Sequence, residues 1–145
     1  MDQPTPEHRR PEGVDDATVE AVDTFTRALE TVEVARGHLL QWHRLTGTGD
    51  TQLREAVEQL RSAGHADLAD RVERELVGRN VIEGRWTFQV IEEYDDHYMT
   101  AWRELEATAR AELVQGRRHL LEAAMKEDNR THGREHHEAV PPSQR

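Results

Sequence analysis

GRNVIEGRWTFQVIEEYDDHYMTAW, residues 78–102, is the stretch around which the chain is organised. It holds two of the three tryptophans, both tyrosines and one of the two phenylalanines. From residue 85 its large apolar residues recur three or four positions apart, which is the spacing of one helix face. Its first residues, 78–84, are rich in glycine, which costs up to about 1 kcal/mol in a helix interior. The pattern therefore predicts an aromatic helix preceded by a break or a kink.

A long first helix is predicted over residues 16–46, with residues 15–18 supplying N-cap candidates. Its apolar side chains follow the three-and-four spacing of a coiled-coil or bundle seam: Val22, Phe25, Leu29, Val32 and Leu39. Arg36 and His43 occupy the same seam, where apolar residues are the rule. Gly47 and Gly49 are predicted to end this helix.

Shorter helices are expected on both sides of Gly64, over about 50–63 and 65–76, before the aromatic segment. The helical pattern then resumes at Arg85 and runs to Leu121, with Asp95 and Asp96 as possible caps of a fresh helix. Short connections favour antiparallel packing. The predicted fold is all-α: an antiparallel helical bundle of four or five helices with a long first helix and disordered termini. Its predicted parts are a disordered arm at 1–14, a bundle domain at 15–128 and a disordered, histidine-rich tail at 129–145.

Composition limits the classes of function. The net charge of −10 argues against non-specific nucleic-acid binding, which requires a positive surface. The chain has no cysteine, so disulfides, thiolate catalysis and cysteine-ligated metals are excluded. No apolar run approaches the roughly 20 residues of a membrane helix, and the polar N-terminus does not resemble a signal peptide. We therefore expect a cytoplasmic protein that binds neither nucleic acid nor membrane.

The hydrophobic fraction is 35%, which is low for a globular domain. Slender helices whose core is shared between subunits fit such a composition, so we expect a homo-oligomer or a complex with a protein partner. The aromatic segment is the expected interface, because aromatic side chains anchor both cores and interfaces. The predicted interaction residues are Trp86, Tyr94, Tyr98 and Trp102. An alternative is a ligand pocket that these side chains line, with Arg79, Arg85 or Arg103 binding an anionic group.

Glu93 and His97 are four residues apart and would share one face of a helix. Together with His43 they are a candidate set of ligands for a divalent metal, although an ion pair that stabilises the helix is the favoured explanation of Glu93 and His97. Ferritin-like di-metal proteins use Glu-x-x-His pairs, and no histidine here has a glutamate three residues before it. His132, His136 and His137 are expected at most to bind a metal loosely.

The two polar seam residues have structural explanations as well. Arg36 would pair with a carboxylate of a neighbouring helix, such as Glu75 or Glu93, and so set the register of packing. His43 would be a core histidine with a satisfied hydrogen bond.

No phosphate-binding loop, nucleophile elbow or basic recognition helix is present, so no catalytic residue and no cofactor are predicted. The functional hypothesis is a non-catalytic helical bundle that self-associates or binds a protein. The alternative is a bundle that binds a metal or a small ligand near His43, Glu93 and His97.

Overall fold

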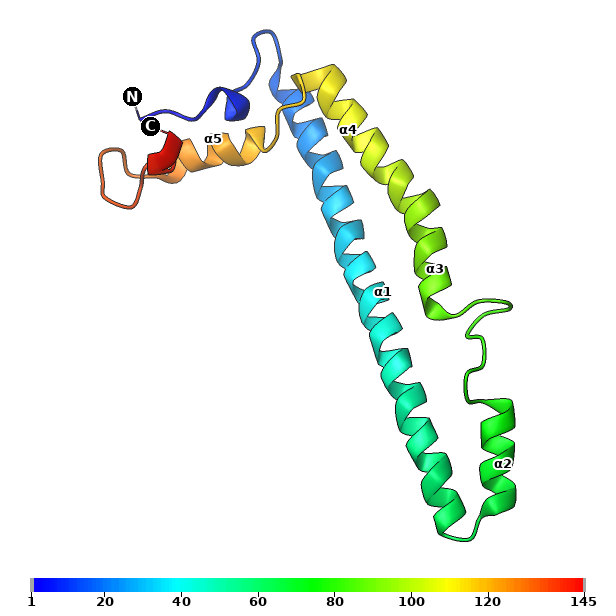
Figure 1. Cartoon of the computed structure of the whole chain (residues 1–145). Coiled ribbons are helices and arrows are strands. Elements are labelled where there is room, and N and C mark those ends of the chain that lie inside the picture. The colour runs from blue at the N-terminus through cyan, green and yellow to red at the C-terminus, as the bar shows by residue number, and fades with distance from the viewer. Residues whose placement is uncertain (1, 145) are drawn as a thin grey trace. The chain divides into compact units, whose positions relative to one another are not determined.

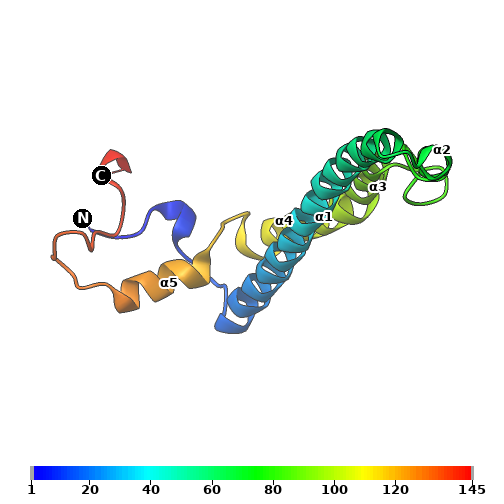
Figure 2. The ribbon, with the colours of Figure 1, turned by 90° about the horizontal axis from the view of Figure 1, so that it is seen from below.

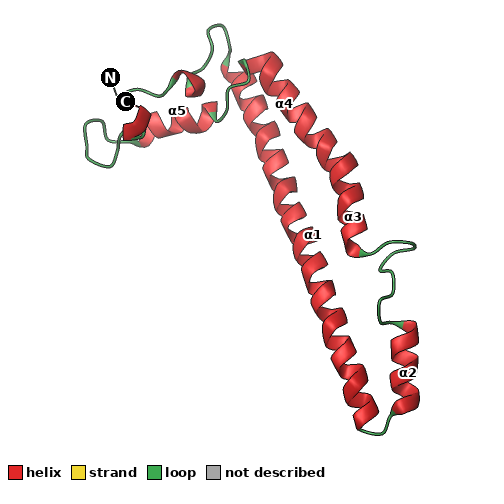
Figure 3. Ribbon diagram, in the orientation of Figure 1, coloured by secondary structure: helices red, strands yellow, loops and turns green. Residues whose placement is uncertain are grey.

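The computed structural model describes residues 2–144, and within this range the chain forms helices and loops without a strand (Figure 3). Five α-helices follow one another along the chain (Figure 1). They are α1 (Asp16–Ser62), α2 (Ala66–Glu75), α3 (Thr87–Tyr94), α4 (Thr100–Val114) and α5 (Leu120–Asn129). Three short turns complete the order: the 3-10 turns η1 (Pro6–His8) and η3 (Pro142–Gln144), and the π-helical turn η2 (Asp95–Met99). The all-α prediction with a long first helix is confirmed.

The chain divides into two compact units. Unit 1 comprises the residues up to Thr31 together with those from Ala101 onward, and unit 2 comprises Val32–Thr100. Helix α1 contributes residues to both.

Helix α1 begins where predicted, because the side chain of Asp15 accepts a hydrogen bond from the backbone N–H of Thr18 at 2.8 Å. The prediction that Gly47 and Gly49 end this helix is wrong, since α1 continues to Ser62. Beyond the glycines, Leu53, Val57 and Leu60 carry on the same three-and-four spacing. Packing of such a stripe contributes more to a helix than a glycine costs, so the helix passes through both glycines.

Substitution of Gly47 or Gly49 by alanine is expected to stabilise the chain by about 0.5–1 kcal/mol each, because alanine loses less backbone entropy in a helix. A Cβ at either position meets nothing within 4 Å, so no clash opposes this gain. Urea unfolding monitored by circular dichroism measures it. The matched control is Gly64→Ala, which is expected to destabilise because Gly64 has a φ of +87°. A loss of stability in Gly47→Ala and Gly49→Ala would contradict the expectation.

After Gly64 the chain reverses, and α2 lies beside the end of α1 (Figures 1 and 2). Arg61 of α1 donates hydrogen bonds to Asp70 and Glu73 of α2, and Ala69 is fully buried. The predicted break at 78–84 is a loop, which extends from α2 to the start of α3. The side chain of Gln89 accepts a hydrogen bond from the backbone N–H of Trp86 at 2.9 Å, which satisfies one free donor at the start of α3.

Within unit 2, three polar residues of the α1 seam, each seven positions from the next, form hydrogen bonds with the returning chain, which is the segment that runs back along α1 after α2. Arg36 donates two hydrogen bonds to Asp95, at 2.7 and 2.8 Å. His43 Nδ1 lies 2.6 Å from Thr87 Oγ1. The carboxylate of Asp50 accepts a hydrogen bond from the backbone N–H of Gly78 at 3.0 Å. Partner numbers fall as seam numbers rise, so the pairing is antiparallel, and polar side chains on a seam select its register.

The π-helical turn η2 lies between α3 and α4, where the prediction allowed a fresh helix capped by Asp95 or Asp96. Instead the Thr100 hydroxyl donates to the carbonyl oxygen of Asp95 at 2.7 Å, and the ladder continues with one extra residue. The side chain of Met99 in this turn is fully buried.

In unit 1 the first turns of α1 pack with α4. The rings of Phe25 and Trp102 meet edge to face with centroids 6.2 Å apart. Thr26 donates a hydrogen bond to the buried carboxylate of Glu106 at 3.0 Å, and Arg110 holds the same carboxylate through two further bonds. The buried apolar side chains of these helices are Val19, Val22 and Val114.

The two terminal segments contact each other within unit 1. Arg130, which is buried, donates hydrogen bonds to Asp2 and to Glu127, and Asp2 also accepts one from the backbone N–H of Ala139 at 2.8 Å. Apart from η1 and η3, the described parts of 1–14 and 130–145 have no regular secondary structure. Their assignment as disordered segments outside the bundle domain stays a prediction.

Candidate functional site

Unit 2 contains a hollow of about 600 Å³ between α1 and the loop that precedes α3. Its α1 side is formed by residues 46–53, and its other side by residues 76–87. The large apolar side chains in its wall are those of Leu53, Leu76, Val81 and Trp86. The Trp86 indole N–H donates to the carbonyl oxygen of Gly78 at 3.2 Å, which holds the ring in the wall.

Gly47 and Gly49 also line this hollow, on the two flanks of the α1 face that carries Asp50 and Leu53. At both glycines the space that a side chain would fill is open, with nothing within 4 Å of a Cβ. The missing side chains therefore widen the hollow, and the α1 backbone itself forms part of its surface.

Two residues of opposite charge, Asp50 and Arg79, line the hollow, and of these two only Asp50 has an ion-pair partner. Asp50 accepts hydrogen bonds from the Gly78 N–H and, at 2.9 Å, from Arg54. The bond from the Gly78 N–H, followed by the bond from Arg54, lowers the pKa of Asp50 below its ordinary value. At neutral pH the carboxylate is therefore charged, and it accepts both hydrogen bonds. Arg79 lies on the opposite wall, is exposed, and makes no side-chain hydrogen bond or ion pair within residues 2–144.

Outside the hollow, unit 2 exposes many large apolar side chains. They are those of Val34, Leu45, Leu68, Ile82, Phe88 and Tyr98. Val34 and Leu45 lie eleven residues apart and so on nearly the same face of α1, and they are 63% and 61% exposed. The hydrogen bonds of Arg36 and His43 to the returning chain place Val34 level with residues near Tyr98, and Leu45 level with residues near Arg85, just before α3.

The four predicted interaction residues have different contacts. Trp86 lies in the wall of the hollow and is half exposed. The rings of Tyr94 and Tyr98 are in contact, with centroids 5.4 Å apart, and Tyr98 is half exposed. Trp102 belongs to unit 1, where it packs against Phe25. Three of the four therefore remain as candidates on unit 2.

Two of the three predicted metal ligands are engaged by other side chains. His43 is hydrogen-bonded to Thr87, and Glu93 pairs with Arg85 at 2.8 Å. His97 is exposed on η2. Among residues 2–144 no group of three histidine or acidic side chains is placed to hold a metal ion. The geometry thus does not support a metal site at these positions.

The structural explanations for the two polar seam residues hold, but the partner of Arg36 differs. Arg36 pairs with Asp95 and not with Glu75 or Glu93, which lie elsewhere. The hydrogen bonds to Asp95 raise the pKa of Arg36 above its ordinary value, so the pair stays ionised. Sequence reasoning could not choose this partner because the pairing depends on the register between α1 and a segment distant in the chain.

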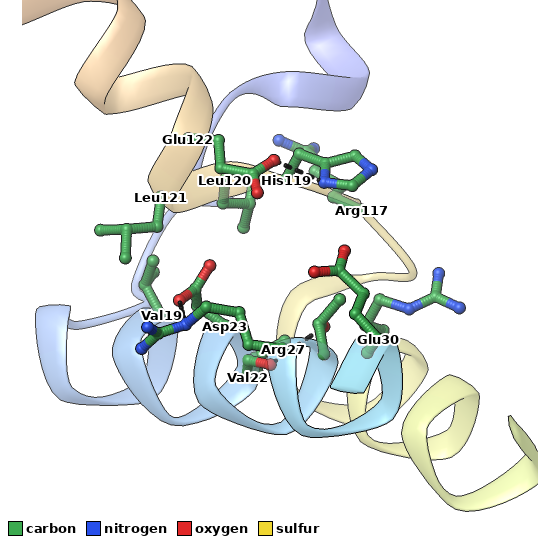
Figure 4. A pocket seen from close by; sticks show the side chains of 12 residues that line it. Val19, Val22, Asp23, Arg27, Glu30, Arg117, His119, Leu120, Leu121 and Glu122 are labelled. Carbon is green, nitrogen blue, oxygen red and sulfur yellow. Dashed lines mark hydrogen bonds and ion pairs between the residues drawn. The ribbon is translucent and has the colours of Figure 1, made fainter. Parts of the chain in front are cut away.

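Unit 1 has a second hollow, of about 20 Å³, which is room for a single water molecule. In its lining (Figure 4), His119 Nδ1 lies 2.7 Å from a carboxylate oxygen of Glu122, and Asp23 and Arg27 form an ion pair on α1. Its size excludes an organic ligand. Unit 1 also has hollows of about 670 and 350 Å³ between its terminal segments, but charged, polar and proline residues form most of their linings. The hollow of unit 2, with its leucine, valine and tryptophan side chains, is therefore the stronger candidate site.

The hollow of unit 2 was not predicted from the sequence. The two glycines were the available signal, and they were interpreted as a helix end. Of the residues that the sequence predicts for a ligand pocket, Arg79 and Trp86 lie in one wall of this hollow. Arg85, another of these residues, pairs with Glu93.

Over the part of the chain that the structure describes, each helix is too short or too polar to cross a bilayer. Comparison of this chain with protein-family models, with curated proteins and with solved structures found no match.

Proposed function

We propose that this chain is a non-catalytic helical-bundle protein that acts through protein–protein contact and associates with a second copy of itself. The observation that carries the proposal is the imbalance of apolar side chains in unit 2. Its buried apolar residues, among those described, are Val57, Ala69 and Met99, whereas six large apolar side chains outside the hollow are exposed.

Two helices in contact along one seam leave most of each helix surface uncovered, and a stable core needs a second layer. A second helical pair packed on the first supplies that layer, as in four-helix bundles. We assign four exposed side chains to the interface: Val34 and Leu45 on α1, Tyr98, which is level with Val34, and Phe88, which lies three residues after the level of Leu45. The cytoplasmic location is part of the same proposal and is supported by the absence of cysteine.

Leu45→Glu is expected to convert the associated protein into single chains, because it places a charge where the proposal buries a leucine. Size-exclusion chromatography with light scattering measures the mass. The wild type should show the mass of two or more chains at micromolar concentration, and the variant the mass of one.

Thr51→Glu is the matched control. Thr51 is exposed on the same helix, about 120° around it from Leu45, and the substitution adds the same charge. The control should associate like the wild type. A wild type with the mass of one chain throughout the micromolar range would refute the proposed self-association.

A further inference from the structure

We propose that the hollow of unit 2 binds a small apolar molecule that carries a carboxylate, with the apolar body against Trp86 and the carboxylate on Arg79. This inference does not rest on the proposed self-association, because Val34 and Leu45 lie outside the hollow.

The size and the walls of the hollow suit a small organic molecule. Its volume of about 600 Å³ falls within the range of roughly 300–1,000 Å³ that is typical of ligand pockets. Leu76, Val81 and Trp86 line it and are 40–52% exposed, so each presents apolar surface to the open space. An apolar body that enters the hollow removes this surface from water, which is the main favourable contribution to its binding.

The glycines of α1 supply a second reason. A glycine in a helix interior is unfavourable by about 1 kcal/mol relative to alanine and is expected where another group must approach the backbone. No group of this chain approaches Gly47 or Gly49, because nothing lies within 4 Å of a Cβ built there. Because Gly47 and Gly49 both line the hollow, a molecule that occupies the hollow can approach the α1 backbone closely at these two positions.

The charged residues at the hollow determine which ligand charge it favours. Asp50 is engaged by the Gly78 N–H and by Arg54, so it offers little attraction to a cation. Arg85, at the base of the same loop, is engaged by Glu93. Arg79 also lies in the wall of the hollow, and the N–H donors of its guanidinium have no partner within residues 2–144. A guanidinium binds a carboxylate through two parallel hydrogen bonds, which selects an acid over a neutral molecule of the same shape.

Cinnamate and cinnamyl alcohol are matched probes, since they share the apolar body and differ in charge. The readout is the indole N–H signal of Trp86 in nitrogen-labelled full-length protein, identified among the three tryptophan signals by Trp86→Phe. Cinnamate should shift this signal saturably, and cinnamyl alcohol should bind about tenfold more weakly. Arg79→Gln should reduce the affinity for cinnamate to that for the alcohol.

Gly49→Leu tests the location, because its side chain extends into the hollow and should abolish the shift. Gly37→Leu is the control: Gly37 is an exposed glycine of the same helix outside the hollow, and this variant should bind like the wild type. The proposal is overturned if the Trp86 signal does not respond saturably, or if acid and alcohol bind equally to the wild type. It is also overturned if the signal changes with protein concentration and the probes then fail to bind, because a second copy would cover the hollow.

Discussion

Replacing Met99 by alanine is expected to lower the free energy of unfolding by about 3 kcal/mol, because large-to-small substitutions of buried methionine cost roughly 2–5 kcal/mol. The side chain of Met99 is 0% exposed and is the largest fully buried one in unit 2. It lies in the π-helical turn η2. Urea unfolding followed by circular dichroism, at one fixed protein concentration, gives the difference.

Met125→Ala is the matched control for this prediction. Met125 lies on α5 and is half exposed, so the same deletion should cost no more than about 0.5 kcal/mol. Equal losses for the two variants would mean that η2 is not a packed part of the core.

Glu106→Ala has the second largest expected effect, a loss of about 2 kcal/mol, because it removes one partner of a buried ion pair. Glu106 is 5% exposed, and its carboxylate holds both Arg110, at 2.7 and 3.1 Å, and the Thr26 hydroxyl. The loss falls below the range for fully buried pairs because Arg110 is partly exposed and regains water. Glu104→Ala, at an exposed position of the same helix, is the control and should change stability by less than about 0.5 kcal/mol.

The contribution of Glu106 to the free energy of unfolding should depend on pH. Burial opposes its ionisation, but the hydrogen bonds from Arg110 and Thr26 more than offset burial and lower its pKa below the ordinary value. A lowered pKa in the folded state gives stability that is present above the unfolded-state pKa of about 4.3 and is lost as pH falls through the folded-state pKa. The stability difference between wild type and Glu106→Gln should therefore be larger at pH 7 than at acidic pH. A difference that stays constant would show that the charge of Glu106 contributes nothing.

The seam of α1 shows how far the sequence could be interpreted without the structure. Spacing alone identified the helix and the polar residues Arg36 and His43 on the packed face, and residue type gave Asp15 as one of several N-cap candidates. The structure contains all of these features. Asp50 belongs to the same series, seven positions after His43, but it was missed because Gly47 was taken as the end of the helix. Local propensity was given more weight than the continuing apolar pattern, and the pattern was the better guide.

Residue spacing by itself determined the all-α fold, the start of α1, the break near Gly78 and the face of α1 that packs, because these depend on contacts between residues close in the chain. Tertiary structure decided which groups meet: Asp95 for Arg36, Thr87 for His43, and the Gly78 N–H for Asp50. It also decided that the loop after α2 stands away from two glycines of α1 and leaves a hollow there. Such pairings depend on the register between distant segments, and a π-turn of one extra residue changes that register without a clear signal in the sequence.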